Sequence, residues 1–174
     1  KSIRTLNTIA DIYEVNRDYD NYKKVLILAK GRASVGKGIL FRLVNACLKL
    51  GQTEEAEKYY KEYTRIAPND NERLLLEYEI AKANNEPADR QIEILEEYRE
   101  REFTERWAYE LAVLYSRNGQ KDKCVEVCDD MILWFSDGKY VLKAMELKKR
   151  YADLTPSQLE YFNKEQKDSD PRLY

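Results

Sequence analysis

The sequence repeats itself with a period of 34 residues. Windows that begin at Ile3 and run 3–36, 37–70, 71–104, 105–138 and 139–172 align without a gap and cover nearly all of the 174 residues. The fourth position of these windows holds Leu6, Leu40, Leu74, Ala108 and Leu142. A period of this length is typical of helical repeat proteins, in which neighbouring units stack and share one continuous core.

Each window has the hydrophobic pattern of two helices. In its first half, apolar residues follow one another at intervals of three and four, as Leu40, Leu43 and Cys47 do, which places them on one helix face. The second half has an apolar column of its own, which holds Leu26, Tyr60, Ile94, Cys128 and Phe162. Every window is therefore predicted to form a pair of helices.

Short polar segments separate the two helices of a window. Gly51 and Gly119 are suited to end a helix, because glycine adopts the left-handed backbone conformation easily. We expect Thr53 and Asp122 to be the N-caps of the helices that follow. In the third window Pro87 is expected in the first turn of the second helix.

A 34-residue helix–turn–helix unit of this kind resembles the tetratricopeptide repeat. The second window matches that family best, through Leu40, Leu43, Cys47, Gly51, Ala56, Tyr60 and Pro68. The first and fourth windows also fit, through Ile9-Ala10, Tyr13 and Ala29, and through Leu111-Ala112, Tyr115, Gly119, Cys124 and Cys128. The resemblance implies an all-α, right-handed α-solenoid of about five repeats, in which the first helix of each repeat lines a concave side.

The third and fifth windows depart from the pattern. Glu77 and Arg90 stand in columns that are apolar or small in other windows, and Glu146, Lys149 and Gln158 do the same in the fifth. A terminal repeat has no following neighbour and needs a polar outer face. We therefore expect the fifth window to be a capping unit.

The expected domain organisation follows from the windows. One superhelical domain is expected over 1–166, built from the repeats 3–36, 37–70, 71–104 and 105–138 and a capping unit over 139–166. The capping unit is expected to hold a helix over about 139–151 and a final, shorter helix from Thr155-Pro156. Residues 167–174 are expected to form a flexible tail.

Composition excludes several classes of function. There are 30 Lys and Arg against 32 Asp and Glu, so the chain offers no strong positive field for nucleic acid. The absence of His removes the Ser-His-Asp triad, the Cys-His dyad and the commonest general base. We expect neither enzymatic activity nor a cofactor. No apolar run reaches the roughly 18 residues of a membrane span, and the start at Lys1 leaves room for a preceding signal or domain.

Two motifs invite functional interpretations that the repeat register explains more simply. The segment from Gly31 to Lys37 fits the phosphate-binding pattern G-x-x-x-x-G-K, but Gly38 replaces the Ser or Thr that would bind Mg²⁺. We interpret it as a flexible turn between repeats. Cys124 and Cys128 form an incomplete zinc site and occupy packing columns. Unpaired core thiols favour a reducing compartment, and hence the cytoplasm.

The resemblance also indicates where a partner would bind. The fifth position of each window is expected to point into the concave groove and holds Asn7, Phe41, Leu75, Tyr109 and Lys143. Other positions of the same face bring the predicted binding residues to Asn7, Phe41, Arg42, Asn45, Leu75, Arg106, Tyr109, Val113, Arg117 and Lys143. The Lys, Asn and Arg clamp by which some relatives hold acidic C-terminal peptides is not matched in any register.

Two functions are consistent with these observations. The first is a protein–protein interaction scaffold that binds a peptide or partner protein in the groove, without direct nucleic-acid binding and without a membrane segment in this chain. The second is a ligand- or peptide-sensing module of a larger bacterial regulator whose other domain lies outside this sequence. The oligomeric state and the identity of the partner are left open by the sequence.

Overall fold

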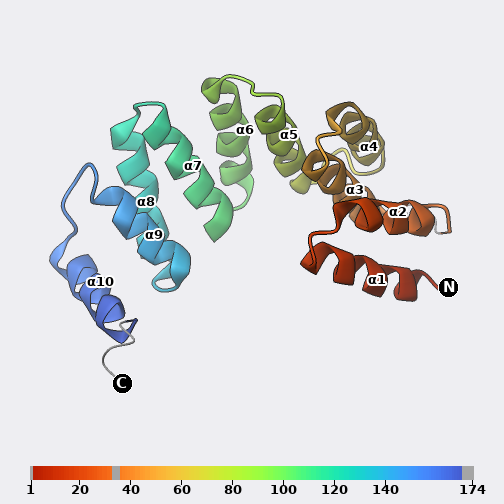
Figure 1. Cartoon of the computed structure of the whole chain (residues 1–174). Helices are drawn as coiled ribbons and strands as arrows, with labels where there is room; N and C mark the ends of the chain where they lie inside the picture. The colour runs from red at the N-terminus through yellow and green to blue at the C-terminus, as the bar shows by residue number, and fades with distance from the viewer. Residues whose placement is uncertain (1, 33–35, 170–174) are drawn as a thin grey trace. The chain divides into compact units, whose positions relative to one another are not determined.

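The computed structural model describes residues 2–32 and 36–169, and within them the chain forms ten α-helices and no strand (Figure 1). The helices are α1 (Ile3–Val15), α2 (Tyr19–Lys30), α3 (Lys37–Lys49), α4 (Thr53–Ile66), α5 (Glu72–Ala83), α6 (Ala88–Arg101), α7 (Glu105–Arg117), α8 (Lys121–Phe135), α9 (Lys139–Lys148) and α10 (Pro156–Asp168). Each 34-residue window holds two of them, as predicted. We call α1, α3, α5, α7 and α9 the first helices of their repeats.

The chain divides into two compact units, Lys1–Ile94 and Leu95–Tyr174, and each is described by itself. In the first unit, α3 packs against α2 and α4 and also against α5, the first helix of the next repeat. Its core includes predicted residues such as Leu26, Leu40 and Cys47 and also others, such as Tyr22 and Tyr63, that the columns did not indicate. The buried side chains form two clusters, which contain Ala10, Tyr22, Leu26, Leu43 and Ala46, and Leu40, Val44, Cys47, Ala56, Tyr63, Leu76 and Ile80.

The second unit shows the same packing order. Helix α7 packs against α8 and against α9, and α9 also contacts α8 and α10. Val141, Met145 and Phe162 form a buried cluster that attaches α10 to α9. Beside this cluster, Lys148 is only 5% exposed, and its Nζ donates to Asp129 at 2.7 Å and to Gln158 at 3.1 Å. A buried cation with two partners thus links α8, α9 and α10.

The helix ends confirm the predicted glycines and correct the predicted caps. Gly51 and Gly119 have φ of +72° and +73° and follow the last residues of α3 and α7. Thr53 and Asp122 are not N-caps, because α4 begins at Thr53 after Gln52, and α8 begins at Lys121 after Gln120.

The correction has a simple geometric cause. The N–H of Gln52 donates to the carbonyl of Cys47 at 2.9 Å, which is the long hydrogen bond of a Schellman motif. The residue that closes α3 is therefore also the cap of α4, so the next helix begins earlier than the sequence indicated. Pro87 likewise lies just before α6, where its carbonyl accepts the first hydrogen bonds of that helix from Arg90 and Gln91.

The C-terminal pair of helices differs in length from the prediction. Helix α9 has 10 residues and ends at Lys148, whereas α10 has 13, so the final helix is not the shorter one. Thr155 and Pro156 do begin α10, and Thr155 forms a capping box with Gln158. The helix continues to Asp168, past the expected start of the tail at 167, and residues 170–174 lie outside the described part of the chain.

The departures in the third window compensate each other. Arg90 on α6 donates to Glu77 on α5 at 2.5 Å, and Tyr60 on α4 donates to the other carboxylate oxygen of Glu77 at 3.4 Å. In the second window the same two columns hold Leu43 and Ala56, which are fully buried. An ion pair therefore joins the helices of this repeat where the second repeat uses apolar contact.

Candidate functional site

The ten predicted binding residues fall equally into the two units. Unit 1 holds Asn7 on α1, Phe41, Arg42 and Asn45 on α3, and Leu75 on α5, and unit 2 holds Arg106, Tyr109, Val113 and Arg117 on α7 and Lys143 on α9. All remain at least partly exposed except Leu75, which is 5% exposed and belongs to the buried side chains of its unit. Leu75 therefore offers little surface to a ligand.

In unit 1, Phe41 and its neighbours on α3 are already engaged within the repeat. The ring of Phe41 lies 6.3 Å from that of Tyr63 and packs against the buried cluster while one side stays exposed. The amide of Asn45 donates to the Phe41 carbonyl at 3.1 Å, one turn earlier in the same helix. Phe41 is thus an anchored aromatic side chain at the surface of α3.

Arg42 has a structural role within unit 1. Its Nε donates to the Tyr22 hydroxyl at 2.9 Å, and its terminal nitrogen donates to Asp11 at 2.6 Å and to Glu14 at 3.4 Å. Its guanidinium also lies 5.2 Å from the centre of the Tyr22 ring. Arg42 therefore connects α3 to α1 and α2, and a ligand would have to compete with these contacts.

In unit 2, the structure brings two predicted binding residues together. Tyr109 on α7 lies 5.9 Å from Tyr140 on α9, and the Lys143 Nζ lies over both rings, at 5.6 Å and 5.2 Å. The Lys139 Nζ also lies over Tyr140, at 5.2 Å. Burial raises the pKa of the Tyr109 hydroxyl, so this phenol is neutral at physiological pH.

This arrangement continues along both helices. Arg106 precedes Tyr109 by three residues, and Arg150 is close enough for its charge to act on the Tyr109 hydroxyl. We use the name Tyr109 face for the surface formed by Arg106, Tyr109, Val113 and Arg117 of α7 and Lys139, Tyr140, Lys143 and Arg150 at α9. Tyr140 and Lys139 were not among the predicted binding residues, although Tyr140 shares the window position of Arg106.

A second surface feature was not indicated by the repeat pattern. Leu133 and Trp134, near the end of α8, are 76% and 73% exposed. Phe103 stacks on Phe135 with 5.1 Å between the ring centres and contacts Trp134 edge-on. Helix α8 ends directly afterwards, where Ser136 has a φ of +65°. The signal available in the sequence was the apolar run at the end of this helix, outside the columns that define the core.

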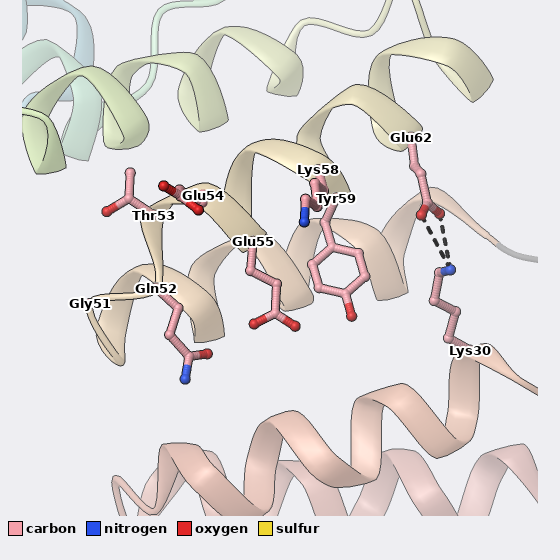
Figure 2. A pocket seen from close by; sticks show the side chains of 9 residues that line it. All are labelled: Lys30, Gly51, Gln52, Thr53, Glu54, Glu55, Lys58, Tyr59 and Glu62. Carbon is pink, nitrogen blue, oxygen red and sulfur yellow. Dashed lines mark hydrogen bonds and ion pairs between the residues drawn. The ribbon is translucent and has the colours of Figure 1, made fainter.

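A cleft of about 800 Å³ lies in unit 1 beside α4 (Figure 2). The residues that line it are Lys30, Gly51, Gln52, Thr53, Glu54, Glu55, Lys58, Tyr59 and Glu62. Lys30 pairs with Glu62 at 3.0 Å, and Lys23 of α2 pairs with Glu55 at 2.5 Å. Two of the three carboxylates in the lining, Glu55 and Glu62, are thus paired with lysines.

The three cysteines are all free and buried. Burial raises the pKa of each thiol, to about 11 for Cys47, and also raises the pKa of Cys124 and of Cys128. These side chains are therefore thiols and not the thiolates that bind zinc or attack substrates. Over residues 2–32 and 36–169, no group of three or more His, Cys, Asp or Glu side chains is placed to hold a metal ion.

The segment that resembles a phosphate-binding loop lies partly outside the described residues, which exclude 33–35. Of the part that is described, Lys37 begins α3 and forms an ion pair with Asp70. The described chain also contains no strand to precede such a loop. Within that same part, no helix has the length and hydropathy needed to cross a membrane.

Comparison with known proteins identifies the repeat. The ten described helices and their packing order assign the chain to the all-α helical repeat proteins of the solenoid type. A family model described as tetratricopeptide repeat matches residues 38–70, which is the second window almost from end to end. The chain's resemblance to the tetratricopeptide repeat family is thereby confirmed. No curated protein matches the sequence.

Solved structures extend this similarity in fold to nearly the whole chain. MamA 41-end from Desulfovibrio magneticus RS-1 is 16% identical with a TM-score of 0.65, and the alignment covers 97% of each chain. A thermophilic TPR protein in Thermus thermophilus is 13% identical with a TM-score of 0.63, over 94% of this chain and 98% of the other. At these identities the comparison shows a shared fold.

Proposed function

We propose that this chain is a protein–protein interaction scaffold that binds a peptide or a partner protein on the exposed faces of its first helices. The observation that carries the proposal is the placement of Phe41 and Tyr109. Both are large aromatic side chains on first helices, both are held by neighbouring rings, and both keep part of their surface exposed. Rigid aromatic side chains of this kind commonly supply most of the energy of an interface.

Neighbouring polar groups support a peptide as the ligand. The bond from Asn45 to Phe41 uses one amide hydrogen and leaves the Asn45 carbonyl oxygen to accept from a peptide N–H. An aromatic anchor on one unit, together with a few backbone hydrogen bonds, is expected to give a micromolar complex, about −8 kcal/mol. Because the chain has no His and its cysteines are buried thiols, the proposal includes no catalytic step.

Selection from a random library of displayed 12-residue peptides tests the proposal. The parent chain is expected to enrich a peptide family, and the variants Phe41→Ala or Tyr109→Ala are expected to weaken binding of the selected peptides about tenfold or more. Tyr19→Ala is the matched control, because Tyr19 is a half-buried aromatic residue on a second helix. Circular dichroism must show the parent helicity in every variant.

Two results would contradict the proposal. The first is that no peptide family is enriched by the parent chain. The second is that both alanine variants unfold, since Phe41 and Tyr109 would then be core residues and the map of the binding faces would be wrong.

The alternative, a sensing module of a larger regulator, predicts a different readout. It requires that the region upstream of Lys1 in the gene encodes a DNA-binding or enzymatic domain. It further requires that a bound peptide changes the activity of that domain. Reading the upstream sequence distinguishes the two functions.

A further inference from the structure

Each unit holds basic side chains that form ion pairs with its own carboxylates, as Arg99, Arg101, Lys123 and Lys148 do in unit 2. The Tyr109 face is distinguished by cations that lack such a partner in the described part of the unit. In unit 1, Lys23, Lys30, Lys37, Arg42 and Arg90 all form ion pairs with carboxylates of the same unit. Among the described residues of unit 2, no carboxylate forms an ion pair with Arg106, Arg117, Lys139, Lys143 or Arg150 of the Tyr109 face. Arg106 and Arg117 belong to α7, Lys139 and Lys143 belong to α9, and Arg150 follows the end of α9. The two helices pack against each other (Figure 1).

The aromatic rings concentrate this positive charge further. The Lys143 ammonium lies above both Tyr109 and Tyr140, and the Arg106 guanidinium lies 4.5 Å from the centre of the Trp107 ring. Such contacts attract a cation to a ring face but do not neutralise its charge. The face therefore combines aromatic surface with cations that form no ion pair within the described part of their unit, which is the complement of a ligand that carries carboxylates beside apolar side chains.

We infer that the Tyr109 face selects acidic peptide segments, in which Asp or Glu residues pair with Arg106, Lys143 and Arg150 while an apolar side chain rests on Tyr109 and Tyr140. This inference rests on the proposed scaffold function and specifies the chemistry of its partner. Single-stranded nucleic acid is the other anionic polymer with groups that stack on tyrosine rings. The structure favours a peptide because the chain carries 30 Lys and Arg against 32 Asp and Glu, so it offers no extended positive field for a continuous phosphate backbone.

The peptide selection described above already separates this inference from the function it rests on. If the parent chain enriches no peptide family, the scaffold function fails. If it enriches families that carry no excess of Asp and Glu, the scaffold function stands and the acidic preference is overturned.

A direct measurement uses three defined probes. They are a fluorescein-labelled 12-residue peptide that alternates Glu with Leu and Phe, the same peptide with Lys in place of every Glu, and a 12-nucleotide single strand of mixed sequence. The acidic peptide is expected to bind with a micromolar Kd that rises several-fold between 50 and 300 mM NaCl, because salt screens exposed charges. The Lys peptide is expected to bind at least about tenfold more weakly.

Charge reversal locates the site. Lys143→Glu is expected to weaken the acidic peptide about tenfold and to improve binding of the Lys peptide. Lys58→Glu is the matched control, since Lys58 is an exposed lysine of α4 in unit 1. Equal losses in the two variants would assign the binding to net charge and overturn the inference, as would binding of the single strand that matches or exceeds binding of the acidic peptide.

Discussion

The ion pair between Glu77 and Arg90 can be replaced by the apolar contact that closes the preceding repeat. The double variant Glu77→Leu with Arg90→Ala restores the residue types of Leu43 and Ala56 at the equivalent positions. A cleft of about 260 Å³, with Ile80 and Ile94 in its lining, lies beside the pair and can accept the new leucine. We expect the double variant to be more stable than the parent.

The size of the effect follows from burial. Full burial of a leucine side chain contributes about 1.5–3 kcal/mol, and the lower half of this range applies because the Glu77 side chain is 26% exposed. Loss of the partly exposed Glu77–Arg90 pair, with the contacts of Glu77 to Arg73 and of Arg90 to Glu93, costs about 0.2–1 kcal/mol. The half-buried Tyr60 hydroxyl can replace its 3.4 Å hydrogen bond to Glu77 by one to water. The expected net gain is therefore about 1 kcal/mol in the free energy of unfolding.

Urea unfolding of the parent, both single variants and the double variant measures this gain and the coupling between the two positions. Each single variant should have a lower free energy of unfolding than half of the double variant's gain would give. The reason is that a single change leaves one charge of the pair beside an apolar neighbour. Glu97→Leu with Arg101→Ala is the matched control, since that pair lies one turn apart on the exposed surface of α6. A double variant less stable than the parent, or single effects that simply add, would refute the reasoning.

Three further predictions concern charge and backbone strain. Lys148→Met should stay within about 1 kcal/mol of the parent's free energy of unfolding, because methionine fills the same volume. Lys148→Ala should lose about 1–3 kcal/mol, because it removes both the packing and the hydrogen bonds to Asp129 and Gln158. Urea unfolding distinguishes the two variants. Lys37 holds the pKa of Asp70 below its ordinary value, so this pair adds stability above about pH 4 that is lost as the pH falls; Asp70→Asn should therefore flatten the acid side of the stability profile measured by thermal unfolding. Ser136→Gly should raise the melting temperature by relieving the positive φ, at about 0.5–1 kcal/mol, and an unchanged or lower value would show that the turn is not strained.

The repeat register could be predicted because apolar residues recur at the same position of each 34-residue repeat, where the packing of neighbouring helices buries them. Leu26, Ile94, Cys128 and Phe162 are buried in the structure as the 34-residue period indicated, whereas Tyr60, the member of the same column in the second window, is only half-buried. The helix caps were less predictable, because Gln52 closes one helix and begins the next through a backbone hydrogen bond that every residue type except proline can donate.

The candidate binding surface was predictable only in part. Spacing placed Tyr109 and Lys143 on one face, and the structure brings their side chains together. It did not reveal that Leu75 is buried, nor that Lys148 is, because each depends on contacts with other helices. The pairing of Glu77 with Arg90 was hidden for the same reason: each departure looked unfavourable alone, and their mutual compensation requires the two helices to be placed in space.

The buried thiols are distributed so that thiol labelling can measure the opening rate of each unit separately. Cys47 lies in the first unit, and Cys124 and Cys128 lie in the second, with no thiol exposed in the native state. A thiol reagent can therefore modify either unit only while that unit is transiently open. Mass spectrometry of the peptides that carry the labelled cysteines would then report one opening rate for each unit, and it would need no amino-acid substitution. Equal rates would mean that the units open together.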